Sequence, residues 1–277
     1  MEDRRARGPE ASSSGSNASP STKSTESSAT SRTTSSSRAS GSIVRTSAWG
    51  DPVMRGGAGW WLCWFAIAVV VGMQAGTIFK PLGSVGDTRV ADWIDLAVPF
   101  AILGCAVMML SSAGAARSSW VVMFLGGVAF ALGHGLHLAA NSISNVADTT
   151  VADASIVHLW DEVASHYIWY SGLYLVLVAL WVVLSGRPIR IRPVGAVLGV
   201  LVAITLVNTY IEGGVPWLGL TFLATGIAAG LTRPRTPAGQ LALLIGGIGF
   251  TLLLGWGLAW YVADGTIFPE FSDVGWI

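Results

Sequence analysis

The sequence predicts an all-α membrane protein, a bundle of about seven transmembrane helices that follows a disordered N-terminal tail. Of its 277 residues, 52% are hydrophobic and only 12% are charged, which is too apolar for a soluble domain that must cover itself with polar side chains. From Gly59 onward, apolar runs alternate with short polar breaks. Most of these runs approach the roughly 20 apolar residues that one helical span requires.

The first segment of the chain, residues 1–57, is rich in Ser, Thr, Arg, Gly and Ala and has almost no large apolar side chains. Such a segment buries too little surface to offset the entropy lost on ordering, so we expect a disordered tail. No apolar core of a signal peptide precedes Gly59, and the first apolar helix is therefore expected to stay as a signal anchor. The transmembrane domain is expected over 58–264, and a short extracytoplasmic C-terminal tail over 265–277.

The apolar runs define the expected spans, with boundaries accurate to a few residues. These spans lie at 59–79, 92–112, 119–141, 164–185, 193–212, 215–231 and 238–262. Gly213 and Gly214 separate the fifth span from the sixth, so a tight helical hairpin is expected there. Exposed irregular backbone is strongly disfavoured in hydrocarbon, which places this turn outside the lipid core.

The basic residues predict the orientation. With the tail in the cytoplasm, the outer loops hold only Lys80 and Arg89. The short inner loops then hold Arg117, Arg187, Arg190, Arg192, Arg233 and Arg235. An excess of Lys and Arg in short loops marks the cytoplasmic side, so the N-terminus is expected inside and the C-terminus outside. The acidic residues gather on the outer side, where their negative field would attract cations.

All four histidines lie between positions 134 and 166, in the third and fourth spans and the outer loop that joins them. On the third span, His134, His137 and Asn141 follow the spacing i, i+3, i+7 and share one helical face. On the fourth span, Glu162 and His166 are four residues apart. Because the third span exits outward and the fourth re-enters, His137 and His166 are expected at similar depth and facing each other.

Further polar side chains collect at the same end of the predicted bundle. They are Gln74, Asp92, Asp95, Asn208 and Glu212. Ionisable groups within membrane helices cost several kcal/mol unless they are paired, hydrated or coordinated, so their convergence is a hypothesis of a functional site.

The sharpest hypothesis for this site is a transition metal, zinc or iron, with an open position for hydrolysis of a lipid-like ester or amide. Glu162 would be a ligand or general base, and Asp161 or Asp95 would orient a ligating imidazole, which makes Glu162 and Asp161 the expected catalytic residues. The imidazole ligands would be His134, His137 and His166.

Three alternatives stand beside the metal site. A haem between His134 or His137 and His166 would give an electron-transfer protein. Glycines would leave room for the porphyrin, namely Gly126, Gly127, Gly133, Gly135 and Gly172. A transporter or receptor for a small cation would use the acidic residues Asp92, Asp95, Glu162 and Glu212. In the third alternative, the polar residues only hydrogen-bond neighbouring helices and have no catalytic role.

No family resemblance is claimed. A seven-span bundle with histidines invites comparison with the alkaline ceramidase and adiponectin-receptor type of membrane hydrolase, but the last predicted span has no histidine. This span has no lysine either, so it lacks the Schiff base of a microbial rhodopsin. The expected partners are the lipid bilayer and a lipid-like or small cationic ligand, and no nucleic acid is expected.

Overall fold

The computed structural model describes residues 57–146, 151–187 and 193–276, and these segments are helical apart from loops and one short hairpin. Helices occupy every position at which the sequence predicts a span. Five of them are long and apolar enough to cross a membrane, so the chain is an integral multi-pass membrane protein. The predicted tail lies outside the described residues, apart from Gly57, and stays a prediction.

The first two predicted spans are each interrupted. The first breaks at Met73 and Gln74, and the second breaks before Pro99, whose ring clashes with the helical carbonyl four residues earlier. The elements are α1 (Ala58–Gly72), α2 (Ala75–Ile78), the 3₁₀ turn η2 (Lys80–Leu82), β1 (Ser84–Val85), β2 (Thr88–Arg89), α3 (Val90–Asp95) and α4 (Val98–Ser112). The two strands pair antiparallel. The predicted span 59–79 thus contains two helices, α1 and α2, with the break between them.

The rest of the chain forms longer helices. They are α5 (Arg117–Val146), α6 (Val151–His158), η3 (Leu159–Ala164), α7 (Ser165–Leu184), α8 (Pro193–Glu212), α9 (Pro216–Thr232) and α10 (Pro237–Asp264). The segment η3 is π-helical and joins α6 to α7, so this helix begins well before the predicted residue 164. The two shorter apolar helices are α1, with 15 residues, and α9, with 17.

The turn between α8 and α9 is the predicted glycine hairpin. Gly214 has a φ of 60°, in the left-handed region that side chains with a β-carbon rarely adopt. The next helix, α9, begins at Pro216. Proline is tolerated in the first turn of a helix, because the N–H that it lacks would have no partner within the helix there.

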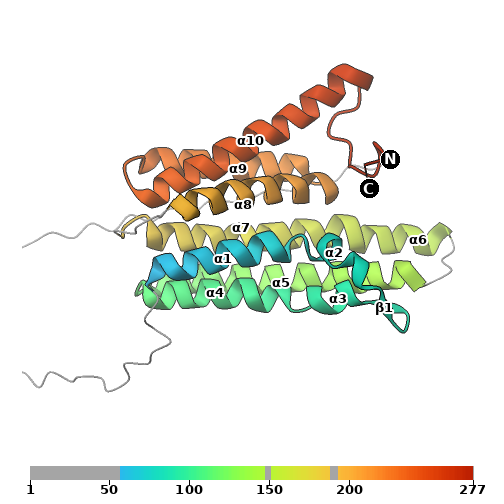
Figure 1. Ribbon diagram of the computed structural model, residues 1–277, viewed down its shortest axis with the longest axis horizontal. Coiled ribbons are helices and arrows are strands. Elements are labelled where there is room, and N and C mark those ends of the chain that lie inside the picture. The colour runs from blue at the N-terminus through green and yellow to red at the C-terminus, as the bar shows by residue number, and fades with distance from the viewer. Residues whose placement is uncertain (1–56, 147–150, 188–192, 277) are drawn as a thin grey trace, which may run out of the picture. The chain divides into compact units, whose positions relative to one another are not determined.

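The helices divide into two neighbouring groups (Figure 1). α5 and α7 lie side by side and α1 packs on α4, whereas α10 packs on α9 and α8, and α1 also meets α8. Gly133 and Gly172 allow the backbones of α5 and α7 to touch, because a β-carbon at either position would collide with the backbone of Trp169 or Phe130. Such close approach is the main source of attraction between helices in lipid.

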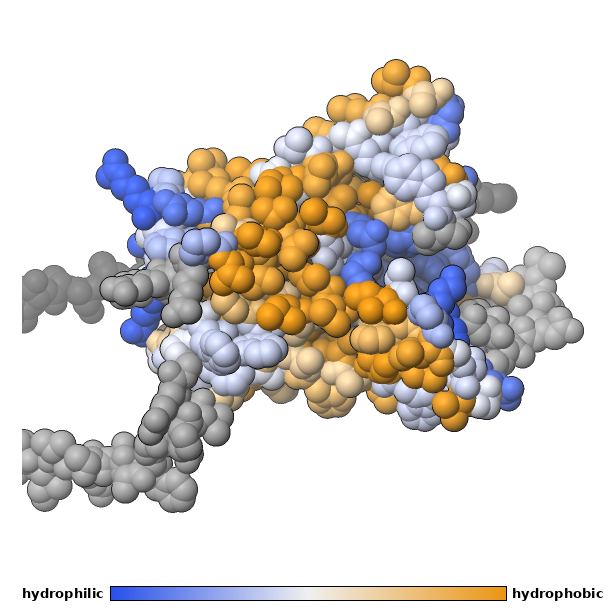
Figure 2. All heavy atoms as spheres, in the orientation of Figure 1, coloured by the Kyte–Doolittle hydropathy of each residue, from blue (hydrophilic) through white to orange (hydrophobic). Residues whose placement is uncertain are grey.

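The two ends of the bundle differ in charge, and we name them by their residues. The arginine end holds Arg117, Arg187, Arg233 and Arg235, and the histidine end holds the four histidines. Figure 2 shows hydrophobic side chains over the middle of the face in view and hydrophilic ones mainly toward the ends. Outward-facing side chains such as Phe100 and Val262 are 78% and 83% exposed, which suits contact with lipid.

Candidate functional site

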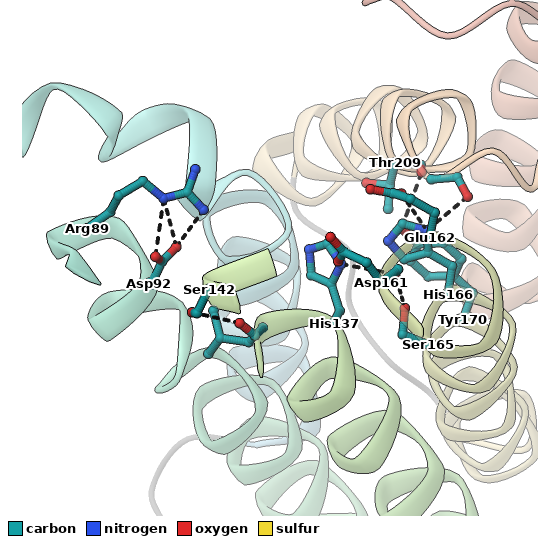
Figure 3. A network of polar contacts seen from close by, with 12 residues as sticks. Arg89, Asp92, His137, Ser142, Asp161, Glu162, Ser165, His166, Tyr170 and Thr209 are labelled. Atoms are coloured by element: carbon teal, nitrogen blue, oxygen red, sulfur yellow. Dashed lines mark hydrogen bonds and ion pairs between the residues drawn. The ribbon is translucent and has the colours of Figure 1, made fainter. Parts of the chain in front are cut away.

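The site lies at the histidine end, between α5 and the continuous helix formed by η3 and α7 (Figure 3). α5 supplies His134 and His137, η3 supplies Asp161 and Glu162, and α7 supplies His166. The ring centroids of His137 and His166 are 4.8 Å apart, so the two histidines lie at the same depth, as the topology predicts.

His137 is paired with Asp161. Its Nδ1 lies 2.8 Å from Oδ1 of Asp161 and 3.3 Å from the carbonyl oxygen of the same residue, and the Asp161 side chain is buried. The hydroxyl of Ser165 donates to that carbonyl as well. Because π-helical turns are wider than α-helical ones and often occur at functional sites, the geometry of η3 is a second signal beside the pairing.

His166 ties α7 to the turn between α8 and α9. Its Nδ1 donates to the carbonyl oxygen of Gly213 at 2.9 Å and lies 3.4 Å from Oε2 of Glu162. The imidazole stacks on Tyr170 at a centroid distance of 5.3 Å, and the Tyr170 hydroxyl donates to the carbonyl of Thr209 at 3.3 Å. His166 is therefore held in one orientation by contacts on both sides.

His134 lies deeper, against α3. Its Nε2 is 3.0 Å from the carbonyl oxygen of Asp95 and 3.5 Å from Oδ1 of Asp95, and its side chain is 1% exposed. Its Nδ1 is buried and has no hydrogen-bond partner among the described residues. Both carboxylates that were expected to orient an imidazole, Asp161 and Asp95, therefore lie beside one.

Trp169 is the residue of this site that sequence reasoning missed. Its indole lies among the three imidazoles, with centroid distances of 4.6 Å to His134, 5.5 Å to His137 and 6.0 Å to His166. The available signal was its position three residues after His166, on the helical face that also carries Tyr170. The indole fills the space at which the imidazoles would otherwise converge.

The structure does not support the predicted metal site at His134, His137, His166 and Glu162. Within residues 57–146, 151–187 and 193–276, no group of three or more His, Cys, Asp or Glu side chains is placed to hold a metal ion. The physical reason is the orientation of the rings. One nitrogen of each imidazole faces an oxygen atom of the protein, and the rings pack against one another and against Trp169 instead of aiming at one centre.

Three of the five glycines expected to make room for a porphyrin instead bring α5 and α7 together. At Gly126, Gly133 and Gly172 the space is filled by the opposing helix of the α5–α7 pair. With their centroids 4.8 Å apart, the rings of His137 and His166 leave no room for a macrocycle between them.

The other predicted polar residues lie around the site without joining it. Asn208 donates to Gln74 at 3.1 Å, which links α8 to the break after α1, and Asn141 also has an interaction partner. Asp92 forms an ion pair with Arg89 at 2.8 Å, apart from the histidines (Figure 3). The bond between Asn208 and Gln74 matches the interhelical hydrogen bonds of the third alternative, whereas the ion pair of Arg89 with Asp92 is local.

The C-terminal segment folds back onto the helix ends beside the site. The indole N–H of Trp256 donates to the carbonyl of Pro269 at 2.9 Å, and the backbone N–H of Phe271 donates to Oε1 of Glu212 at 3.1 Å. Burial raises the pKa of Glu270, and the neighbouring carboxylates of Glu162, Asp273 and Glu212 raise it further. The segment therefore adds an acidic side chain close to Glu162.

These observations define a class: a helical integral membrane protein with imidazole–carboxylate pairs at one end of its bundle. No protein-family model, curated protein or solved structure matches this chain. Any more specific function has to be argued from the geometry of the site.

Proposed function

We propose that this membrane protein is proton-coupled, a transporter or receptor that binds protons at the imidazole–carboxylate pairs of the histidine end. The observation that carries the proposal is the contact between two such pairs, His137 with Asp161 and His166 with Glu162. Chains of Asp, Glu and His within membrane helices are typical of proton pathways in pumps and transporters.

The pairs form a series from an accessible group to buried ones. The Glu162 side chain is 36% exposed, His166 lies 3.4 Å from it, and the side chain of Asp161 at the far end is 9% exposed. In both imidazoles Nδ1 donates to an oxygen, so a further proton is accepted at Nε2. Glu162, the most exposed member of the series, exchanges protons with water at this end of the bundle.

Charges from other elements also act on the series. Asp95 on α3 acts electrostatically on His137, and His158 on α6 and Glu212 on α8 act on Glu162. Gain of a proton by either imidazole therefore changes the electrostatic interactions between α5, α7 and α8. Such a change can shift the packing of helices and so drive a proton-dependent switch.

A histidine titration in lipid nanodiscs tests the proposal. Protein labelled with ¹⁵N-histidine is followed by NMR from about pH 8 down to well below about pH 5, because a free imidazole changes charge between about pH 5 and 8 and a buried one changes charge at lower pH. We expect His137 and His166 to titrate as a coupled pair, so that His166→Gln shifts the midpoint of His137. His158→Gln is the comparison, because this exposed histidine of α6 acts on Glu162 from outside the two pairs, and it is expected to shift the midpoint of His137 less than His166→Gln does. Independent titration of the two rings, or no protonation of either, would contradict the proposal.

Hydrolysis of a lipid-like substrate is the second candidate, and one observation favours it. Asp161 lies 2.8 Å from Nδ1 of His137. A carboxylate in this position orients an imidazole so that its other nitrogen can act as a general base. Release of fatty acid or head group from outer-leaflet lipids, lost in His137→Ala, would support this candidate. Metal analysis of the same preparations tests the zinc or iron that the sequence suggested.

A further inference from the structure

A large apolar groove occupies the arginine end of the bundle, away from the histidines. It has a volume of about 1900 Å³ and lies between α7 and α1 on one side and α8, α9 and α10 on the other. Its walls are mainly aliphatic, with Leu177, Leu198, Leu241 and Ile245 among them. Small-molecule sites measure roughly 300–1,000 Å³, so this groove suits a larger apolar ligand.

The inner end of the groove is closed by aromatic side chains. Tyr174, Tyr210 and Phe222 are the lining residues of α7, α8 and α9 that come closest to the histidine end. The Tyr174 hydroxyl donates to Thr225 at 2.8 Å, and its ring stacks on Phe222 at 4.0 Å, so α7 and α9 are joined there. Tyr174 precedes the end of α7 at Leu184 by ten residues, roughly 15 Å of helix, and Arg187 follows three residues later, so the groove is long enough to hold much of an acyl chain.

The mouth of the groove is positively charged. Arg187 lines it and is exposed, and the one hydrogen bond described for its guanidinium, to the carbonyl of Gly114 at 3.4 Å, leaves other donors for a ligand. Arg233 and Arg235 lie at the same end, whereas the described acidic residues belong to the histidine end. An anionic head group is therefore favoured at the mouth, and arginine suits phosphate oxygens in particular.

We infer that this groove is a binding site for an anionic phospholipid, with an acyl chain between the two helix groups and the phosphate at Arg187. Such a lipid covers the apolar walls and joins α7 to α8–α10 on the arginine side of the contact of Tyr174 with Phe222 and Thr225. The inference does not depend on the proton site, which lies at the other end of the bundle.

Native mass spectrometry of the full chain tests the inference with two probes, phosphatidylglycerol and phosphatidylcholine carrying identical acyl chains. We expect several-fold greater retention of phosphatidylglycerol by the unmodified protein. Arg187→Gln is expected to reduce that retention to the level of phosphatidylcholine, whereas Arg117→Gln, an exposed arginine outside the groove, is expected to leave it unchanged.

A second pair of variants tests the walls of the groove. Gly226 lines the groove, and an added β-carbon meets its nearest atom at 3.9 Å, so Gly226→Leu is expected to fill space and lower retention of both lipids. Gly255→Leu is the control, since nothing lies within 4 Å of a β-carbon there and it is outside the groove. Equal retention of the two lipids by the unmodified protein, or a preference that survives Arg187→Gln, would overturn the inference, as would a neutral lipid found at this site in the purified protein.

Discussion

The two ends of the bundle are held together in different ways. At the histidine end, helices meet through specific polar contacts and through backbones that touch at Gly133 and Gly172. At the arginine end, the two helix groups separate around an apolar groove. The buried imidazoles and carboxylates are therefore held in a fixed geometry by direct helix contacts, whereas the mainly apolar walls at the arginine end enclose open space.

The largest expected effect comes from filling the closest helix contact. Gly172→Leu places a side chain against the backbone of Phe130, so α5 and α7 must separate, and we expect a loss of about 3 kcal/mol or more in unfolding free energy. The matched change at the open end, Gly226→Leu, is expected to cost less than about 1 kcal/mol. Thermal unfolding in detergent measures both. Similar losses would remove the distinction between a tight and an open end.

Asp161→Asn sharpens the comparison within the histidine end. This change removes the negative partner of the half-buried His137 ring, and we expect a loss of about 2 kcal/mol, the usual worth of a hydrogen bond to a charged group. Asp92→Asn is the control, because the partner of Asp92 is the partly exposed Arg89, and no more than about 1 kcal/mol is expected. Chemical unfolding of the two variants under one set of conditions makes the test, and a larger loss for Asp92→Asn would contradict it.

A smaller effect is expected at the hydrogen bond between Gln74 and Asn208. A double-mutant cycle with Gln74→Leu and Asn208→Leu should give a coupling energy of about 0.6 kcal/mol, the average for such bonds between membrane helices. The same cycle for Tyr174→Phe and Thr225→Val is the reference at the arginine end, where the bond is exposed. A coupling of zero at Gln74 would show that this bond does not hold α8 to α1.

The smallest effect concerns the C-terminal segment and depends on pH. Because the pKa of Glu270 is raised in the folded protein, the docked C-terminal segment binds a proton more readily than the undocked one. Protonation of Glu270 therefore stabilises the docked segment at low pH. This stabilisation is lost as pH rises from the ordinary glutamate value through the raised one. Hydrogen exchange of residues 266–276 should therefore quicken over that interval, and less so in Glu270→Gln. The same pH profile in both proteins would exclude Glu270 as the cause.

The helix positions were predictable because lipid imposes long apolar runs, and five of those runs meet the length requirement directly. The breaks were not predictable from apolarity. Residues 59–79 read as one run, yet the helix stops at Gly72, and Gln74 after it turns to Asn208 on α8. The partner of Gln74 lies 134 residues later in the chain, so local apolarity carries no signal of this contact.

The contact of His137 with His166 followed from topology, since consecutive helices return through the same depth. Topology did not predict which residues are the hydrogen-bond partners of each ring. Helical spacing pairs Glu162 with His166, but it cannot show that Gly213 supplies the carbonyl at 2.9 Å or that Trp169 packs beside the imidazoles. These contacts depend on the crossing of α5 and α7 at glycines, which a pattern of residue types does not reveal.

The π-helical segment Leu159–Ala164 has a consequence for how this site could arise. A π-helical turn holds about one residue more than an α-helical turn, which is the local result of a single-residue insertion. One added codon here would rotate the residues before the wide turn about the helix axis relative to the long apolar helix after Ser165, which would keep its place in the membrane. A new acidic site can thus enter an existing span in one genetic step, without redesign of the bundle around it.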